Sequence, residues 1–122
     1  MRARRTPPVG DPLIQQTLLG EAIDNGPAAV FVMGDDGRYV AVNATACRLL
    51  GYEREELLAI DRAALTPEAD VEAHLASLKR DGDVSGTISL RAKNGELVEF
   101  TYRTSESTVA RMLFWIMVAF PA

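Results

Sequence analysis

The sequence predicts an α+β fold, in which a five-stranded antiparallel sheet carries short helices on one face and a flanking helix precedes the sheet. Three observations predict this class. β-rich runs surround Asp36-Gly37, others surround Asn94-Gly95, and both dipeptides are typical of hairpin turns. The segments between these two hairpins have apolar residues at helical spacing. The last strand is apolar on both sides, which indicates a sheet that is covered on both faces.

The chain divides into a leader, a flanking helix and a domain. Residues 1–10 are basic and contain two prolines, and we interpret them as a flexible leader without the apolar core of a signal peptide. An amphipathic flanking helix is expected over residues 11–25, because Leu13, Ile14, Thr17 and Leu18 fall on one face at helical spacing. A glycine just beyond it is expected to end this helix. The domain itself is expected over residues 26–122 and begins with the first hairpin.

Short helices and one longer helix are expected after the first hairpin. Asn43 is expected to cap a helix over residues 44–50, because its side-chain oxygen can accept a hydrogen bond from an unpaired N–H group. The acidic run EREELL predicts a second short helix, with its carboxylates near the positive end of the helix dipole. The longer helix is expected over residues 66–82, with Thr66 as its cap and Pro67 at its first position.

Three strands are expected at the end of the chain, over residues 84–92, 97–104 and 110–120. The last of them carries two apolar rows, which are Met112, Phe114, Ile116 and Val118 on one side and Leu113, Trp115 and Met117 on the other. The helices of the domain are expected to cover one side. The N-terminal helix, from the same chain or from a partner copy, is the candidate to cover the other.

Composition excludes several classes of function. The chain has 122 residues and a net charge of -4, so one domain is expected and a nucleic-acid partner is not, because phosphate contact needs a basic face. A single Cys and a single His exclude an internal disulfide, a Cys-based zinc site and most His-rich metal sites. No apolar run is long enough for a membrane span. These features favour a cytoplasmic location.

Three segments together resemble the PAS family of sensory domains. DDGRYVAVNATACRLLGY resembles the run of that family in which Asp-Gly, a strand, Asn-x-Ala, a helix and Gly-Tyr follow one another. EREELL is similar to the helix that comes next, and RAKNGELVEFTYR to the hairpin with Asn-Gly at its turn. The resemblance extends from about Leu19 to Phe120, which is nearly the whole chain.

The resemblance implies a sensory or regulatory module in bacterial-type signal transduction, with a small-ligand pocket, a dimerisation surface and no catalysis of its own. A homodimer is expected, and the signal is expected to pass to an effector domain or a partner protein. The candidate pocket residues are Val32, Val42, Leu50, Leu57, Val71, His74, Leu75, Leu78, Ile88, Phe100, Tyr102 and Met117. The candidate dimer-interface residues are Leu13, Leu18, Leu113 and Trp115.

The resemblance leaves a haem-binding gas sensor as an alternative. In the haem-binding members of the family the iron ligand is a His on the long helix, and His74 follows Pro67 at a similar spacing. Against haem, the Arg that those sensors place near the bound gas corresponds to Gly86, and the aromatic residues that follow their His are absent. The other reading of His74 is a core residue bonded to the backbone.

Two further alternatives have less support from the residues. A light-sensing flavin site is disfavoured, because Cys47 comes before the Gly-Tyr pair rather than after it, and Cys47 is then a small buried apolar residue. A small α+β enzyme of the isomerase or hydratase type needs buried acid–base groups. His74 and Tyr102 are the candidates for such groups, and no carboxylate is placed in the sequence to orient them.

Overall fold

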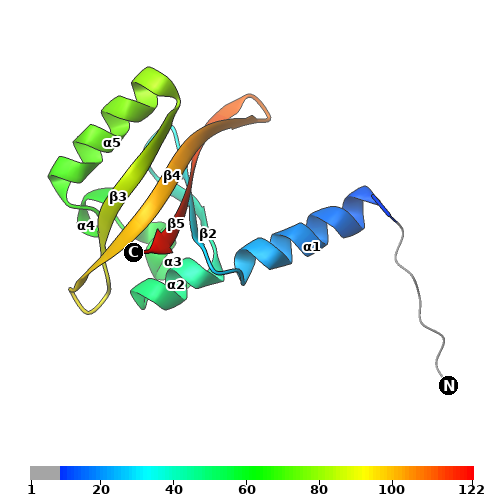
Figure 1. Cartoon of the computed structure of the whole chain (residues 1–122), viewed down its shortest axis with the longest axis horizontal. Helices are drawn as coiled ribbons and strands as arrows, with labels where there is room; N and C mark the ends of the chain where they lie inside the picture. Colours follow the sequence, from blue (N-terminus) through cyan, green and yellow to red (C-terminus); the bar gives the residue numbers. More distant parts are fainter. Residues whose placement is uncertain (1–8) are drawn as a thin grey trace.

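The computed structural model describes residues 9–122, except for the side chains of residues 68–72. Figure 1 shows a curved sheet with short helices against one of its faces, while the first helix extends away from the rest of the fold. Most of the leader expected over residues 1–10 lies outside the described residues. Within residues 9–122, no helix is both long and apolar enough to cross a bilayer.

The chain forms five helices and five strands in the described part. In order these are α1 (Pro12–Asp24), β1 (Ala29–Gly34), β2 (Tyr39–Val42), α2 (Ala44–Leu50), α3 (Arg54–Ala59), α4 (Arg62–Leu65), α5 (Glu68–Asp81), β3 (Asp83–Arg91), β4 (Leu97–Val109) and β5 (Met112–Pro121). The α+β class is therefore confirmed, with its five-stranded sheet. The four-residue helix α4 was not predicted, and β4 continues five residues beyond its expected end.

All pairings in the sheet are antiparallel, and the strand order is β2-β1-β5-β4-β3. The last strand thus lies at the centre, between β1 and β4. Met117 of β5 is paired with Phe31 on one side and with Thr104 on the other. Side chains paired in this way point to the same face of a sheet, so these three form one row on the inner face, which the helices cover.

The core fills the space between the inner face of the sheet and helices α2 to α4. Along β1 the inward residues are Ala29, Phe31 and Met33, all of them buried, whereas Val30 and Val32 point to the outer face and are half-buried. This alternation is what a strand requires when only one of its faces is packed on a core. Further core residues come from β2, from the helices, and from the last three strands and the turn after β3: Val42, Ala46, Leu50, Leu57, Leu65, Ile88, Leu90, Ala92, Phe100, Tyr102, Met117 and Ala119.

Asn43 joins four parts of the chain at the start of the sheet. Its Oδ1 accepts hydrogen bonds from the backbone N–H groups of Ala46 (3.0 Å) and Val30 (2.9 Å). Its Nδ2 donates to the carbonyl oxygens of Ile23 (2.7 Å) and Ala28 (2.8 Å). The predicted cap of α2 is therefore confirmed, and the same side chain also holds the end of α1 and the beginning of β1.

Asp24, the last residue of α1, adds a second link at this point. Its Oδ1 accepts a hydrogen bond from the backbone N–H of Ala44 (2.9 Å) and another from Nη2 of Arg54 (2.9 Å). A carboxylate beside the first N–H groups of a helix is favourable, because those groups have no partner within the helix. The end of α1 is thus fixed to both α2 and α3.

One local expectation was wrong, and one of two alternatives is decided. The longer helix starts at Glu68, one residue later than expected, with Pro67 rather than Thr66 at its cap. Thr66 instead ends α4 and is buried there. The flanking helix forms, yet it does not cover the sheet of its own chain, since none of its residues is buried and it points away from the domain (Figure 1). On the outer face, Met112, Val118 and Phe120 of β5 consequently remain exposed.

We predict that Asn43→Ala lowers the free energy of unfolding by about 3 kcal/mol, because four buried or half-buried backbone groups lose their partner together. Urea denaturation followed by circular dichroism measures this. Asn94→Ala is the matched control. Asn94 is exposed in a hairpin turn, where its Oδ1 accepts a single hydrogen bond from Glu96 N–H, so a loss below about 1 kcal/mol is expected. Equal losses in the two variants would contradict the role given to Asn43.

Candidate functional site

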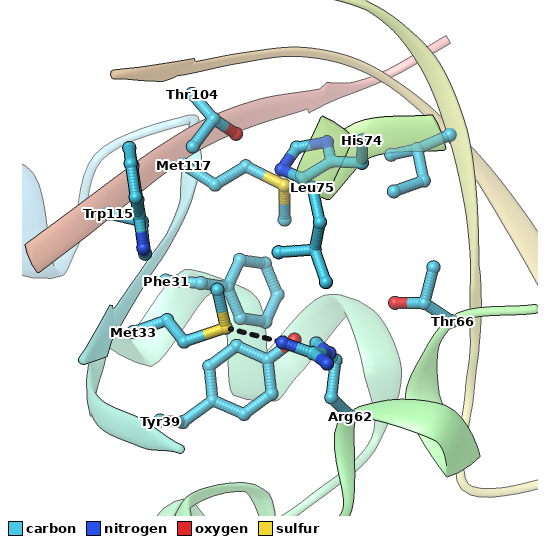
Figure 2. Close-up of a pocket in the computed structure, with 11 residues that line it drawn as sticks. Phe31, Met33, Tyr39, Arg62, Thr66, His74, Leu75, Thr104, Trp115 and Met117 are labelled. Carbon is cyan, nitrogen blue, oxygen red and sulfur yellow. Dashed lines mark hydrogen bonds between the residues drawn. The ribbon is translucent and has the colours of Figure 1, made fainter. Parts of the chain in front are cut away.

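A small cavity lies between helices α4 and α5 and the inner face of the sheet. Its volume is about 40 Å³. Its wall is formed by side chains from both hairpin strands, from the two helices and from the last three strands: Phe31, Met33, Tyr39, Arg62, Thr66, His74, Leu75, Ile88, Thr104, Trp115 and Met117 (Figure 2). We call this space the inner cavity. Most of its wall is apolar, and the polar groups stand at separate points.

A second, more open space adjoins the inner cavity beneath the turn between β1 and β2. This vestibule has a volume of about 380 Å³ and is lined by Met33, Asp35, Asp36, Gly37, Arg62, Leu75, Leu78, Lys79, Leu113 and Trp115. Met33, Arg62, Leu75 and Trp115 line both spaces. These four side chains therefore form the partition between the inner cavity and the vestibule.

Arg62 is the permanent cation in the wall of the inner cavity. Its Nη1 lies 3.6 Å from Sδ of Met33, a contact drawn in Figure 2 beside the ring of Tyr39. The turn glycine Gly37 lies directly over the guanidinium, because a Cβ at that position would be 2.9 Å from Nη1. Burial raises the pKa of Tyr39 to about 12, although the Arg62 charge and a hydrogen bond with Thr66 partly oppose this. Tyr39 is therefore neutral at physiological pH.

His74 stands on α5, at the side of the inner cavity nearest β4. A hydrogen bond of 3.1 Å joins its Nδ1 to Oη of Tyr102, and the two rings pack with their centroids 5.1 Å apart. Burial lowers the pKa of His74, and the nearby Arg62 cation lowers it further. The imidazole is thus held in its neutral form at pH 7, partly inside the core as the sequence predicted.

Thr104 points into the inner cavity from β4 and is almost completely buried. Its Oγ1 has no hydrogen-bond partner among the described groups. A buried hydroxyl without a partner costs about 1–3 kcal/mol, so such groups are rare in folded proteins. This hydroxyl is available to a polar atom that enters the inner cavity.

The structure brings together only some of the residues that the sequence assigned to a pocket. His74, Leu75, Ile88 and Met117 line the inner cavity. Leu78 lines the vestibule, and Tyr102 lines an adjoining groove with His74 between α5 and β3. The remaining described candidates do not line the inner cavity: Val42, Leu50, Leu57 and Phe100 are core residues, and Val32 lies on the outer face of the sheet. The side chain of Val71 lies outside the described residues.

Two of the four candidates for a dimer interface were placed on the wrong face. Leu113 and Trp115 share one side of β5 with Met117, and all three point inward, where they line the vestibule, the inner cavity or both. Alternation along the strand was read correctly, but both rows of β5 are apolar, so the sequence did not show which one faces the helices. Leu13 and Leu18, the other two candidates, are exposed on α1.

The sequence analysis missed the polar wall of the inner cavity, namely Tyr39, Arg62, Thr66 and Thr104. Thr104 had a usable signal, because it continues the inward row of Phe100 and Tyr102 at a period of two. Arg62 had none, since it starts a helix of only four residues and its direction depends on the turn above it.

The inner cavity does not fit the planar cofactors considered from the sequence. Cofactor and drug-sized sites occupy about 300–1,000 Å³, whereas the inner cavity holds about 40 Å³. Cys47 does not line the inner cavity. Among the described residues, no three His, Cys, Asp or Glu side chains gather where they could hold a metal ion.

An antiparallel sheet that closes a cavity against short helices defines a class of small α+β domain with an internal pocket. Residues 27–116 match the model of the PAS domain. No curated protein sequence matches this chain. Because the family match covers most of the sequence, the chain belongs to the PAS domain family. Domains of this family are typically sensory modules of signalling proteins.

Solved structures share the fold. A PAS domain from a two-component sensor histidine kinase is 18% identical, with a TM-score of 0.78, and the match covers 90% of this chain and 98% of that one. A domain of a sensory box sensor histidine kinase/response regulator from Geobacter sulfurreducens is 20% identical, with a TM-score of 0.74 and coverage of 93% and 99%. An RNA-binding light-oxygen-voltage receptor is 18% identical, with a TM-score of 0.76 and coverage of 99% and 37%. At these identities the likeness shows the fold alone.

We predict that the protein loses stability as the pH falls from 7.5 to 6, because His74 is the only histidine and its pKa is lowered by folding. The unfolded imidazole takes up its proton near pH 6.5, while the folded one does so only at lower pH, so acid favours the unfolded state across this range. Urea denaturation at several pH values measures the slope. His74→Gln is expected to reduce it, and an NMR titration that places the pKa of His74 above 6.5 would contradict the prediction.

Proposed function

We propose that this chain is a sensory PAS module that binds a small molecule in the inner cavity and has no catalytic activity of its own. The observation that carries the proposal is the buried hydroxyl of Thr104, which faces a mostly apolar cavity and has no hydrogen-bond partner among the described residues. An apolar cavity with a few separate polar groups is typical of a small-molecule site. The vestibule shares four lining residues with the inner cavity, so a ligand would enter from the vestibule past these side chains.

The inner cavity limits the size of the ligand. A cavity of about 150 Å³ binds benzene, and the inner cavity is several times smaller. A ligand therefore has few non-hydrogen atoms inside the cavity, or it displaces Met33 and Leu75 and extends into the vestibule. Met33 is suited to such a change, because the methionine side chain is unbranched and flexible.

We predict that native mass spectrometry of the freshly purified full chain shows an added small-molecule mass, which disappears when the protein is denatured. The same sample is expected to lack the Soret band of haem, since the inner cavity does not fit a porphyrin. Thr104→Arg is expected to abolish the added mass by filling the cavity, and Thr101→Arg is the control, because Thr101 is exposed on the same strand. An added mass that persists in Thr104→Arg would place the ligand elsewhere.

We further propose that two copies of the chain associate through α1 and the outer face of β5. Leu13, Leu18 and Ile23 on α1 are more than half exposed, and Phe120 on β5 is nearly so. A groove of about 390 Å³ lies between α1 and the first two strands, and its lining includes Leu19 and Ile23 of α1 and Val30 and Val32 of β1. Strand β1 is paired with β5 through Val30 and Val118, so this groove lies beside the outer face of β5. Exposed apolar surface of this extent is typical of an interaction site.

A second copy is the occupant that best matches these surfaces. Both surfaces belong to one chain and lie on either side of β1, so a two-fold axis would bring each of them to its counterpart in the other copy. The anchoring of Asp24 and Asn43 fixes the end of α1 where it leaves the domain. The helix is thereby held in the position in which its apolar residues stay outside its own fold (Figure 1).

We predict that the double variant Leu18→Glu/Phe120→Glu is a monomer at concentrations at which the unaltered chain is a dimer. Buried carboxylates would oppose the contact, because transferring a charge from water is costly without a partner. Sedimentation velocity measures the change. Val40→Glu is the control, since Val40 is 51% exposed and belongs to neither surface. A monomeric unaltered chain at high concentration would refute the association.

A further inference from the structure

The cation of the inner cavity has no anionic partner within the described structure. The ion pairs of the described residues join Arg54 to Asp24, Arg80 to Asp81, Lys93 to Glu56 and Arg103 to Asp83. Arg62 takes part in none of them. Among the described residues, its one contact with a hydrogen-bond acceptor is the 3.6 Å contact with the thioether of Met33, which is a weak acceptor. A guanidinium has five N–H donors in a planar fork, so most of them have no partner in the part of the chain that the structure describes.

The position of Arg62 directs these donors toward the cavity system. The guanidinium lies in the partition between the inner cavity and the vestibule, under the turn at Gly37. In Figure 2 it approaches the centre of the pocket from α4, next to the ring of Tyr39. An anion that enters through the vestibule therefore meets Arg62 before it reaches the apolar wall beyond.

The other titratable groups that line the inner cavity in the described structure do not cancel this charge. Tyr39 is neutral because burial raises its pKa to about 12, and His74 is neutral at pH 7 because burial lowers its pKa. The vestibule adds the carboxylates of Asp35 and Asp36 and the ammonium of Lys79 on its outer wall. The inner cavity thus carries a positive charge from Arg62, whereas the outer wall of the vestibule carries both signs.

The hydroxyl of Thr104 is a second polar group of the inner cavity without a partner among the described residues. Figure 2 shows Thr104 and Arg62 on opposite sides of the pocket, with Phe31, Leu75 and Met117 between them. A hydroxyl can donate one hydrogen bond and accept others. A molecule that binds both Arg62 and Thr104 needs an anionic group at one end, a short apolar middle and an uncharged polar atom at the other end.

We propose that the inner cavity binds a short-chain hydroxy- or oxo-carboxylate, with its carboxylate on Arg62 and its hydroxyl or keto oxygen on Thr104. This inference rests on the proposed ligand-binding function and names its chemical class. The fork of a guanidinium matches the two oxygens of a carboxylate. The volume of about 40 Å³ restricts the part of the ligand beyond Arg62 to a chain of about four carbons or fewer.

Three probes of similar size test the proposal on the full chain: 4-hydroxybutyrate, butyrate and the uncharged butyramide. Binding is followed by the fluorescence of Trp115, which is the only tryptophan and lines the inner cavity, and by isothermal titration calorimetry. The expected order of affinity is 4-hydroxybutyrate, then butyrate, then butyramide. Arg62→Gln is expected to weaken both carboxylates about ten- to a hundredfold and to leave butyramide unchanged. Thr104→Val is expected to reduce 4-hydroxybutyrate to the affinity of butyrate.

Two further variants serve as controls for the charge and the shape of the Arg62 side chain. Arg80→Gln removes an exposed cation outside the cavity system, and it is expected to bind all three probes as the unaltered chain does. Arg62→Lys keeps the charge but loses the fork, so intermediate affinity for butyrate is expected. Circular dichroism checks that each variant is folded, and Arg62→Lys replaces Arg62→Gln in the comparison if the latter is unfolded.

The outcomes separate this inference from the proposed function. Equal binding of butyrate to the unaltered chain and to Arg62→Gln would overturn the role of Arg62, and tighter binding of butyramide than of butyrate would do the same. If no probe binds while native mass spectrometry still finds a small molecule that Thr104→Arg expels, the carboxylate class is wrong and the sensory pocket stands. If neither probe nor native ligand is found, both proposals fail.

Discussion

The amide of Asn43 is the interaction on which the arrangement of the other elements depends. A primary amide has two donors and two acceptor sites, and Asn43 uses all four on the backbone of α1, of the segment before β1, of β1 itself and of α2. Aspartate or leucine, although similar in size, could not make the same set. The side chain is buried, so water does not compete for these bonds. One residue thereby sets where the first helix ends and where the sheet starts.

Local signals in the sequence were sufficient for much of the fold. The bounds of α2 were predicted to the residue, because Asn43 and Gly51 mark its two ends with side-chain capping and left-handed backbone. The two hairpin turns were also predictable from their dipeptides. The structure of residues 61 to 67 was not predictable, since Asp61 and Thr66 are both good caps and α4 is too short to show periodicity. There the tertiary contacts of Thr66, which is buried, decided the boundary.

The candidate site was less predictable, because its composition depends on which face of each strand is turned inward. Both rows of β5 are apolar, so the sequence contained no information on whether Trp115 or Phe114 meets the helices. The polar wall shows the same limit. Arg62 reads as a surface residue of a short helix, and only its position under the turn at Gly37 turns it toward the cavity. Sequence patterns identify which faces are apolar, but the folded chain selects the face that encloses a site.

Strand β1 connects the end of α1 to the partition of the inner cavity. Near its first residues, Val30 N–H is bonded to Asn43, which also holds the last turn of α1. Near its last residues, Met33 touches Arg62 in the partition of the cavity. Three residues of extended chain span about 10 Å, and hydrogen bonds to β2 and β5 stiffen both edges of this segment. The partition of the cavity and the anchored end of α1 therefore lie at opposite ends of one short, rigid segment of β1.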